Sequence, residues 1–346
     1  MSRTALITGI SGQDGAYLAR FLVEKGYRVV GGLRRAAGDR MARLAELGIE
    51  REVEIVELDL LELTNIMRQL ERVKPDEIYN LAGQTHVGLS FEQPIYTAEV
   101  DAIGPARLLE AIRVVVPQAR FYQASTSEMF GKMPNRSSAA NERHPFHPRS
   151  PYGISKLFAH WMTVSYRDSY GLYAVSGILF NHESPLRGRE FVTRRITHGL
   201  ASIRNGGAGT LALGNLESCR DWGFAGDYVA GMWQMLQQPE PADLVLATGR
   251  SESVRSFAEL AASQLGYDLV WQRDGQDEVG LDRRSSRVLI TVDNALRRPA
   301  EVDWLLGDAS EAKLRLGWSS TTSLESLVGM MIEADMRRYR DGAPAF

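Results

Sequence analysis

The sequence predicts an α/β protein with a doubly wound parallel sheet, followed by a smaller α/β region. Short apolar runs alternate with amphipathic helical segments up to about residue 185, which is the pattern of strand–helix–strand units. A glycine-rich turn separates the first apolar run from the first helix, at residues 9–15. Because such units connect through right-handed crossovers, helices should cover both faces of the sheet.

The elements follow from the spacing of apolar residues. Strands are predicted for the short apolar runs 4–10, 27–33, 54–60, 77–82, 120–126 and 173–181. Helices are predicted between them at 15–26, 64–73, about 98–114 and 151–170. Beyond residue 185 the alternation weakens and Arg, Gly and Pro become frequent, which indicates a smaller capping region. In that region we expect helices at 254–266 and 323–342, and a surface hairpin at 277–293.

The composition is that of an ordinary globular protein, with 44% hydrophobic residues, 24% charged residues and a net charge of −3. It offers no basic stripe for nucleic acid, no apolar run near the ~20 residues of a membrane span, and no signal-peptide layout. The single cysteine, Cys219, excludes an intrachain disulfide and a cysteine-based zinc cluster. We therefore expect a cytoplasmic protein without a metal, a membrane or a nucleic-acid partner.

The turn "TGISGQDG" carries the first functional signal. Gly9, Gly12 and Gly15 follow a strand and open a helix. Glycines here let the backbone approach a pyrophosphate, and the helix N-terminus offers free N–H groups. In this context the motif predicts dinucleotide binding on a Rossmann-type sheet; the alternative is a turn that only packs tightly.

The end of the second predicted strand, "GGLRR", bears on the choice of cofactor. A carboxylate at this place would accept hydrogen bonds from the ribose of NAD, but Arg34 and Arg35 stand there instead. Two guanidinium groups suit a 2′-phosphate and favour NADP; the alternative is two solvated arginines. Asp59 ends the next strand, where an adenine amino group could be met, and "NLAGQT" (80–85) supplies small residues that leave room.

A Tyr–Lys pair and a Thr–Glu pair predict acid–base chemistry. Tyr152 and Lys156 are four residues apart, so both project from one helix face, and an ammonium should lower the pKa of the phenol. Thr126 and Glu128 follow a strand at the sheet edge where ligands bind. Together they suit hydride transfer at a sugar carbinol, with Glu128 as the second acid/base that loss of water needs. Taken separately, the pairs could be a wet helix face and a helix N-cap.

The stretches "TGISGQDGAYLA", "FYQASTSEMFG", "RSPYGISKL", "GILFNHESPLRG", "LGNLESCRDWGFAGDYV" and "RPAEVDWLLGD" resemble the GDP-mannose 4,6-dehydratase family. This family belongs to the extended short-chain dehydrogenase/reductase superfamily, and the resemblance runs from residue 3 to about 335. It implies tightly held NADP and conversion of GDP-mannose to GDP-4-keto-6-deoxymannose. It also implies an NADP-binding domain at 1–185, to which some later segments return, and a GDP-sugar-binding domain at 186–346.

The resemblance assigns residues as well. The implied catalytic residues are Thr126, Glu128, Tyr152 and Lys156. The implied cofactor contacts are Gly9, Ser11, Gly12, Gln13, Asp14, Gly15, Arg34, Arg35, Asp59, Leu60, Leu81, Ala82, Gln84, Tyr96, Tyr152, Lys156, His182 and Arg187. The implied substrate contacts are Thr126, Asn181, Val192, Arg195, Arg220 and Glu301.

One departure and three alternatives remain at this stage. The family usually continues the arginine pair with serines that help to join subunits, and "RRAAGDRMARL" has alanines there. We expect a homodimer or a homotetramer, and this change puts the tetramer in question. The alternatives are a GDP-manno-heptose 4,6-dehydratase, an epimerase or reductase of the superfamily, and a non-catalytic NADP-binding regulator. The intact Thr126, Glu128, Tyr152 and Lys156 argue against the regulator.

Overall fold

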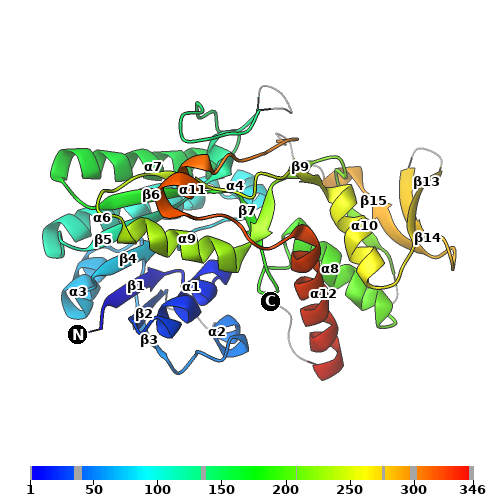
Figure 1. Ribbon diagram of the computed structural model, residues 1–346, viewed down its shortest axis with the longest axis horizontal. Coiled ribbons are helices and arrows are strands. Elements are labelled where there is room, and N and C mark those ends of the chain that lie inside the picture. The colour runs from blue at the N-terminus through cyan, green and yellow to red at the C-terminus, as the bar shows by residue number, and fades with distance from the viewer. Residues whose placement is uncertain are drawn as a thin grey trace.

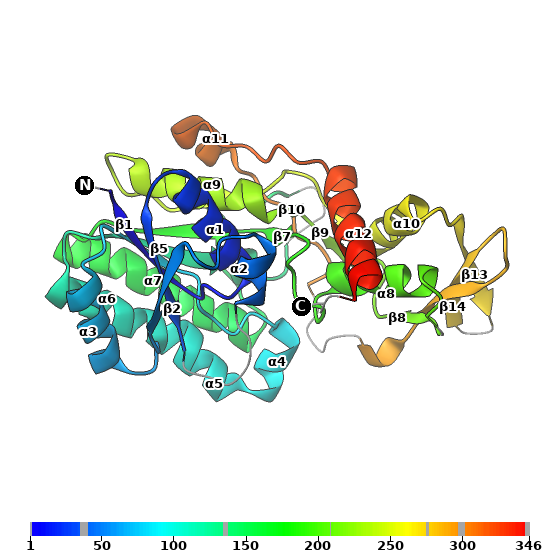
Figure 2. The same ribbon diagram turned by 90° about the horizontal axis from the view of Figure 1, so that it is seen from below.

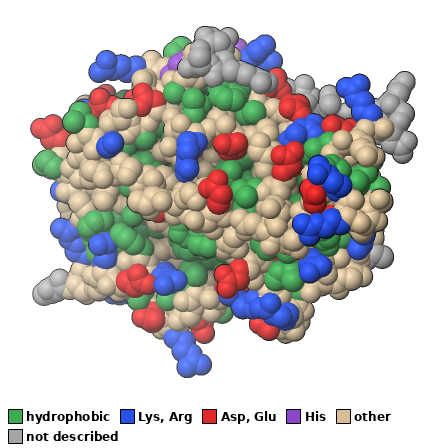
Figure 3. Space-filling model, turned by 45° about the vertical axis from the view of Figure 1, so that its right-hand side comes forward, with side chains coloured by type: hydrophobic (Ala, Val, Ile, Leu, Met, Phe, Trp, Pro, Cys, Tyr) green, Lys and Arg blue, Asp and Glu red, His purple; other side chains and the backbone are tan. Residues whose placement is uncertain are grey.

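The computed structural model describes residues 2–34, 41–133, 138–207, 209–274, 277–296 and 302–342. A large sheet flanked by helices forms one lobe, and a smaller lobe of helices and strands lies beside it (Figure 1). On the face seen in Figure 3, Lys and Arg side chains are interspersed with Asp and Glu rather than gathered by sign. No helix in the described part of the chain is long and apolar enough to cross a membrane.

The large sheet has seven parallel strands in the order β11-β6-β5-β4-β1-β2-β3. Its strands are β1 (Thr4–Thr8), β2 (Arg28–Leu33), β3 (Val53–Glu57), β4 (Glu77–Asn80), β5 (Arg120–Thr126), β6 (Ala174–Leu179) and β11 (Leu244–Leu246). The chain winds outward in both directions from β1 and β4, which confirms the predicted doubly wound Rossmann-type fold. Loops diverge at such a switch point and leave a crevice at the strand ends.

Helices cover both faces of this sheet (Figure 2). On one face lie α1 (Gln13–Glu24), α9 (Ala225–Gln237) and α11 (Ser310–Leu316); on the other lie α3 (Leu63–Val73), α6 (Gly104–Val115) and α7 (Pro151–Tyr170). In β1, Ile7 belongs to the apolar core under α1 and α9, whereas Leu6 belongs to the core under α3 and α6. Successive side chains of a strand point to opposite faces, so a strand buried on both faces is apolar throughout.

The predicted helix at 98–114 is interrupted. The chain instead forms α4 (Val87–Glu92), α5 (Pro94–Ala98), a π-helical turn η1 (Glu99–Ile103) and then α6. The apolar periodicity did not reveal the π turn because its neighbours on both sides are helical. This turn packs against α7, the helix that carries the Tyr–Lys pair.

The smaller lobe has its own sheet and core. Its four strands, in the order β13-β14-β15-β8, are β13 (Leu269–Asp274), β14 (Asp277–Asp282), β15 (Val288–Val292) and β8 (Leu211–Leu213). Helices α8 (Val192–Arg204), α10 (Val254–Gln264) and α12 (Leu324–Asp341) pack together beside it. The hairpin predicted at 277–293 is β14–β15, but its predicted position at the surface is wrong. Its second strand also pairs with β8 and belongs to this core, since Leu289 and Ile290 are fully buried.

Two small ladders and an ion-pair cluster lie between the lobes. The ladders are β7 (Asn181–Glu183) with β10 (Trp222–Phe224), and β9 (Cys219–Arg220) with β12 (Glu252–Ser253). Helix α2 (Ala42–Glu46) meets α12, where Arg338 pairs with Glu46 at 2.7 Å and donates to the Pro185 carbonyl at 2.9 Å. These contacts link the two lobes.

Candidate active site

Two adjoining cavities occupy the carboxyl ends of the large sheet. The first, about 320 Å³, lies along the glycine-rich loop, and the second, about 480 Å³, lies between the lobes. They share Asp14, Leu81, Thr85 and Arg187, so together they form one continuous cleft. A cleft of this size can hold a dinucleotide beside a second ligand.

The glycine-rich loop forms a cradle at the start of α1. Gly9 has a φ of 71°, and a Cβ built on it would lie 2.7 Å from the Ala82 nitrogen. A Cβ on Gly15 would collide with the Gly9 carbonyl oxygen. With Ser11, Gln13 and Asp14, these glycines line the first cavity, and the first N–H groups of α1 are available to a ligand there. The loop therefore fits a phosphate group.

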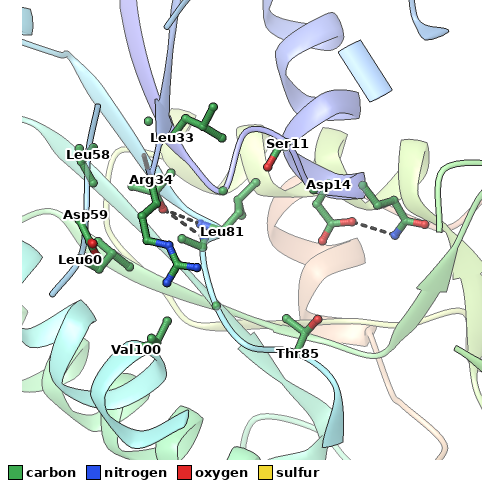
Figure 4. Close-up of a pocket in the computed structure, with 18 of the residues that line it drawn as sticks. Ser11, Asp14, Leu33, Arg34, Leu58, Asp59, Leu60, Leu81, Thr85 and Val100 are labelled. Carbon is green, nitrogen blue, oxygen red and sulfur yellow. Dashed lines mark hydrogen bonds between the residues drawn. The ribbon is translucent and has the colours of Figure 1, made fainter. Parts of the chain in front are cut away.

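Arg34, Asp59 and Leu60 line the end of the first cavity that is far from Ser11 and Asp14 (Figure 4). Tyr96 also lines this cavity. The Arg34 guanidinium donates a hydrogen bond to the Tyr96 hydroxyl at 2.9 Å. Arg34 thus brings a cation to the end of β2, as the sequence predicted. Arg35, its predicted partner, lies outside the described residues.

The loop after β4 separates the two cavities. Leu81, Ala82, Gly83 and Thr85 of this loop line the first cavity. Gln84, a predicted cofactor contact, lines neither cavity. Its side-chain oxygen accepts from the His86 nitrogen at 2.7 Å, and its amide donates to Thr97 at 3.2 Å. Consecutive residues of an extended loop face opposite ways, so the Gln84 side chain points away from the cavities. Its hydrogen bonds hold the loop in place.

Thr126, Glu128, Tyr152 and Lys156 meet at the second cavity. Ser150 caps α7 by accepting from the Gly153 nitrogen at 3.0 Å, and Pro151 occupies its first turn, which places Tyr152 at the cavity wall. The Lys156 ammonium donates to the Ala124 carbonyl at 3.1 Å and lies 5.9 Å from the centre of the Tyr152 ring.

Thr126 and Glu128 are held together at the end of β5. The Thr126 hydroxyl accepts from the Glu128 nitrogen at 3.2 Å, as an N-cap of the short helical turn η2 (Ser127–Met129). The N-cap alternative is therefore correct, and it coexists with a position on the cavity wall. Two hydroxyls, a carboxyl group and an ammonium facing one cavity can move protons to and from a bound sugar.

The electrostatics of this cluster differ from the sequence expectation. Burial raises the pKa of Tyr152 well above its ordinary value, and the negative charge of Asp101 raises it further. Burial also lowers the pKa of Lys156, although the charges of Asp101 and Asp14 oppose this effect. The predicted lowering of the phenol pKa is thus wrong for the site without ligands. Tyr152 is protonated there, and a further positive charge is needed to make it a base.

His182 ties the glycine-rich loop to β7. Its Nδ1 donates to the Phe180 carbonyl at 2.7 Å and its Nε2 donates to the Asp14 carboxylate at 2.7 Å, while its ring stacks on Tyr228. Burial would lower the pKa of His182, but the Asp14 carboxylate and these hydrogen bonds outweigh burial and raise it. Both ring nitrogens face oxygen acceptors, and the raised pKa of His182 favours the charged form of the ring beside Asp14 and the phosphate cradle.

The remaining predicted residues lie around the second cavity. Arg187 contacts both cavities; its Nε is 3.0 Å from Glu183, and its guanidinium lies 3.5 Å over the Phe191 ring. The predicted substrate contacts that line the second cavity are Asn181, Val192, Arg195 and Arg220, whereas Glu301 lies outside the described residues. Lining residues that the sequence reasoning missed include Glu190, Asn215, Ser218, Trp222, Val254 and Leu296.

The parallel sheet, the glycine cradle and the Thr126, Tyr152 and Lys156 cluster define a protein of the extended short-chain dehydrogenase/reductase class. Solved structures share this fold. DesIV, a dTDP-glucose 4,6-dehydratase from Streptomyces venezuelae with NAD and TYD bound, matches with a TM-score of 0.81 and 22% identity over 98% of each chain. RMD from Pseudomonas aeruginosa complexed with NADPH matches with a TM-score of 0.76 and 22% identity, over 98% of this chain and 99% of that one.

Sequence comparison is more specific. The profile of the family described as GDP-mannose 4,6 dehydratase matches residues 6–331. GDP-mannose 4,6-dehydratase of Sinorhizobium fredii is 47% identical over 98% of both chains, and the Homo sapiens protein is 46% identical over 97% of this chain and 92% of its own. The chain belongs to the GDP-mannose 4,6-dehydratase family. The epimerase alternative is not favoured, because the matching family profile and the relatives at 46–47% identity are GDP-mannose 4,6-dehydratases.

Proposed function

We propose that this protein converts GDP-mannose to GDP-4-keto-6-deoxymannose with NADP that remains bound throughout. The observation that carries the proposal is the position of Glu128 beside Thr126, Tyr152 and Lys156, on a cavity that adjoins the phosphate cradle. A simple alcohol dehydrogenase has no use for the extra carboxylate. Membership of the family supports the same reaction over the manno-heptose alternative.

The residues of the first cavity fit NADP. The glycine cradle would hold the pyrophosphate, Arg34 would face the 2′-phosphate, and Asp59 and Leu60 would border the adenosine. Lys156 would hold the ribose next to the nicotinamide, at the junction of the two cavities. When bound, NADP accepts a hydride from C4 of the sugar and returns it to C6.

The protein's own groups move the protons. Tyr152 takes the proton of the C4 hydroxyl while Thr126 donates a hydrogen bond to the reacting oxygen. A positively charged nicotinamide ring, held beside Lys156, would offset the burial that keeps the phenol of Tyr152 protonated. The C4 ketone acidifies C5, and Glu128 removes the C5 proton and protonates the departing C6 hydroxyl, so that water leaves. The proton that Tyr152 took from the C4 hydroxyl then passes to C5, so that Tyr152 and Glu128 both return to their starting protonation states.

The second cavity supplies groups for the GDP part. Arg195 and Arg220, together with Arg187, would neutralise the diphosphate, because guanidinium forks match phosphate oxygens. Asn181 and Val192 border the same space. We assign 1–185 to NADP binding, with α9 and β11 packed onto its sheet, and 186–346 to the GDP-sugar.

We also propose a cytoplasmic homodimer. On α7, Ile154, Phe158 and Trp161 form one stripe at helical spacing and are 57%, 42% and 55% exposed. Ile95 of the neighbouring α5 is 76% exposed. Large apolar side chains gathered on one face suit a second copy of the chain.

The proposed cytoplasmic location follows from the proposed ligands, which are charged nucleotides that do not cross membranes unaided.

Product analysis tests the proposal. Purified protein is incubated with GDP-mannose and separately with GDP-manno-heptose, first without added cofactor and then with NADP⁺, and products are identified by mass spectrometry and NMR. We expect GDP-mannose to lose one water without added cofactor. Turnover of the heptose alone would change the substrate, and an isomer of unchanged mass would indicate an epimerase. Turnover of neither sugar, even with NADP⁺, would refute the proposal.

A further inference from the structure

A buried carboxylate that the proposed mechanism does not use lies beside the catalytic lysine. Asp101 sits in the π turn η1 and is completely buried. Its Oδ1 accepts a hydrogen bond from the Gln84 nitrogen at 2.8 Å. Its Oδ2 is buried and has no hydrogen-bond partner within the described residues. A buried carboxylate oxygen without a donor is costly, so its presence calls for a compensating charge nearby.

Lys156 supplies that charge across Gly83. A Cβ built on Gly83 would lie 2.7 Å from Asp101 Oδ1 and 3.4 Å from Lys156 Nζ. The carboxylate and the ammonium therefore both lie close to the side of this glycine from which a Cβ would project. Any larger residue at position 83 would occupy the space between them. The π turn matters here because an inserted residue changes which side chains of a helix point inward.

The lysine depends on such a partner. Lys156 is 3% exposed, and its ammonium donates to one neutral carbonyl, that of Ala124. Burial without a negative charge would drive the proton off an ammonium group. A neutral Lys156 could neither stabilise the Tyr152 phenolate nor donate fully to a ribose. The acidic groups that raise the pKa of Lys156 are Asp101 and Asp14.

We propose that Asp101 is a positioning residue for the dehydratase reaction, because its carboxylate keeps the Lys156 ammonium charged and directed at Tyr152. This inference rests on the proposed function, since it gives Lys156 its catalytic role. The competing explanation is structural: Asp101 merely accepts the Gln84 N–H and holds the 81–85 loop. The two explanations differ in what happens when the charge alone is removed.

Other ionisable groups also surround the Tyr152–Lys156 pair. They are Asp14 of the glycine-rich loop, Glu128 of η2 and Arg187 of the loop after β7. Burial raises the pKa of Asp101 to about 6, against the pull of Lys156, so the group is ionised at neutral pH. On η1 itself, Glu99 points away and pairs with Arg107 of α6 at 3.0 Å.

The matched pair of variants is Asp101→Asn and Glu99→Gln. Asparagine keeps an oxygen for the Gln84 N–H and removes the charge, whereas Glu99→Gln removes a carboxylate from the same turn at the surface. Lys156 is one of five lysines in the chain, so NMR of ¹³C-labelled lysine can follow its ionisation directly. We expect Asp101→Asn to lower the pKa of Lys156 by about one unit or more, and Glu99→Gln to leave it unchanged.

Two further readouts decide between the explanations. The alkaline limb of the kcat profile should move to lower pH in Asp101→Asn, because Lys156 loses its proton earlier. If Asp101→Asn does not fold, the wild-type Lys156 resonance should itself shift near pH 6, where Asp101 takes a proton. An unchanged Lys156 titration and an unshifted limb, or no step near pH 6 in the wild type, would overturn the proposal. The NMR titration needs no turnover, so an inactive protein would refute the proposed function and still test Asp101.

Discussion

At the scale of single residues, the site is a set of buried groups whose charges depend on one another. Burial raises the pKa of Tyr152 and lowers the pKa of Lys156, and the charges of nearby carboxylates oppose the lowering at Lys156. The phenol of Tyr152 can therefore remain protonated in the empty cleft and act as a base once cofactor and substrate are bound. The sequence predicted the partners Tyr152 and Lys156 but not Asp101, because burial and through-space charges need the folded chain.

Replacing Tyr152 with Phe should stop the reaction at its first step. Without the phenol no group takes the C4 proton, so neither reduced-cofactor absorbance nor keto product should form. Tyr166→Phe is a control near the other end of the same helix, where the Tyr166 hydroxyl donates to Glu110 at 3.0 Å. A Tyr152→Phe protein with more than about a hundredth of the wild-type kcat would contradict this role.

Replacing Glu128 with Gln should separate oxidation from elimination. The amide cannot remove the C5 proton, so dehydration should fall by about 10²- to 10⁴-fold. Slow formation of reduced cofactor should persist, because Tyr152 and Thr126 are intact. Glu92→Gln, at the rim of the same cavity, should behave as wild type. Full retention of dehydration in Glu128→Gln would show that another group acts at C5.

At the scale of elements, the cleft is held by contacts between segments far apart in the sequence. The apolar runs predicted the strands of the large sheet, because a strand buried on both faces must be apolar. They did not predict the π turn at 99–103, since a helical pattern does not report which residue is inserted. The sequence also did not predict the pairing of Asp14 with His182, because 168 residues separate the two.

Stability against pH should report the Asp14–His182 pair. Because the pKa of His182 is raised, its contribution is complete below the ordinary value of 6.5 and is lost as pH rises through the raised value. The pKa of Asp14 is lowered in spite of burial, so acid removes the pair only below its ordinary value of 3.8. His182→Asn should therefore cost about 1–3 kcal/mol in the free energy of unfolding near pH 6, and less near pH 9.

His198 provides a control, because its effect on the free energy of unfolding should change with pH in the opposite direction. Burial lowers the pKa of His198, so its stabilisation should grow as pH rises through the lowered value. Urea titrations of nucleotide-free protein at several pH values measure His182→Asn and, as the control, His198→Asn. A His182→Asn deficit that is constant with pH, or that increases toward pH 9, would refute the ion-pair account.

At the scale of the whole molecule, the substrate side of the cleft comes from the smaller lobe and from its ladders with the larger one. Asn215, Trp222 and Leu296 reach the second cavity from separate segments. No local pattern in the sequence brings such residues together. The resemblance located Arg195 and Arg220 there, and the rest of the wall required the structure.

The exposed stripe of α7 predicts the assembly of the protein. Trp161→Glu combined with Ile154→Lys should convert the proposed dimer to a monomer, since two charges would replace apolar contact area. Light scattering over a range of concentrations measures the mass. Leu314→Lys, which changes a side chain that is 79% exposed on α11, is the control. A double variant that remains dimeric would place the interface elsewhere.

The central claim is that one bound cofactor removes a hydride from C4 and returns it to C6 of the same sugar. The most direct measurement incubates the protein with GDP-mannose deuterated at C4, without added cofactor, and locates the label in the product by NMR. The account predicts a 6-deoxy-4-keto product with the deuterium at C6. Deuterium lost to solvent, or retained at C4, would contradict it.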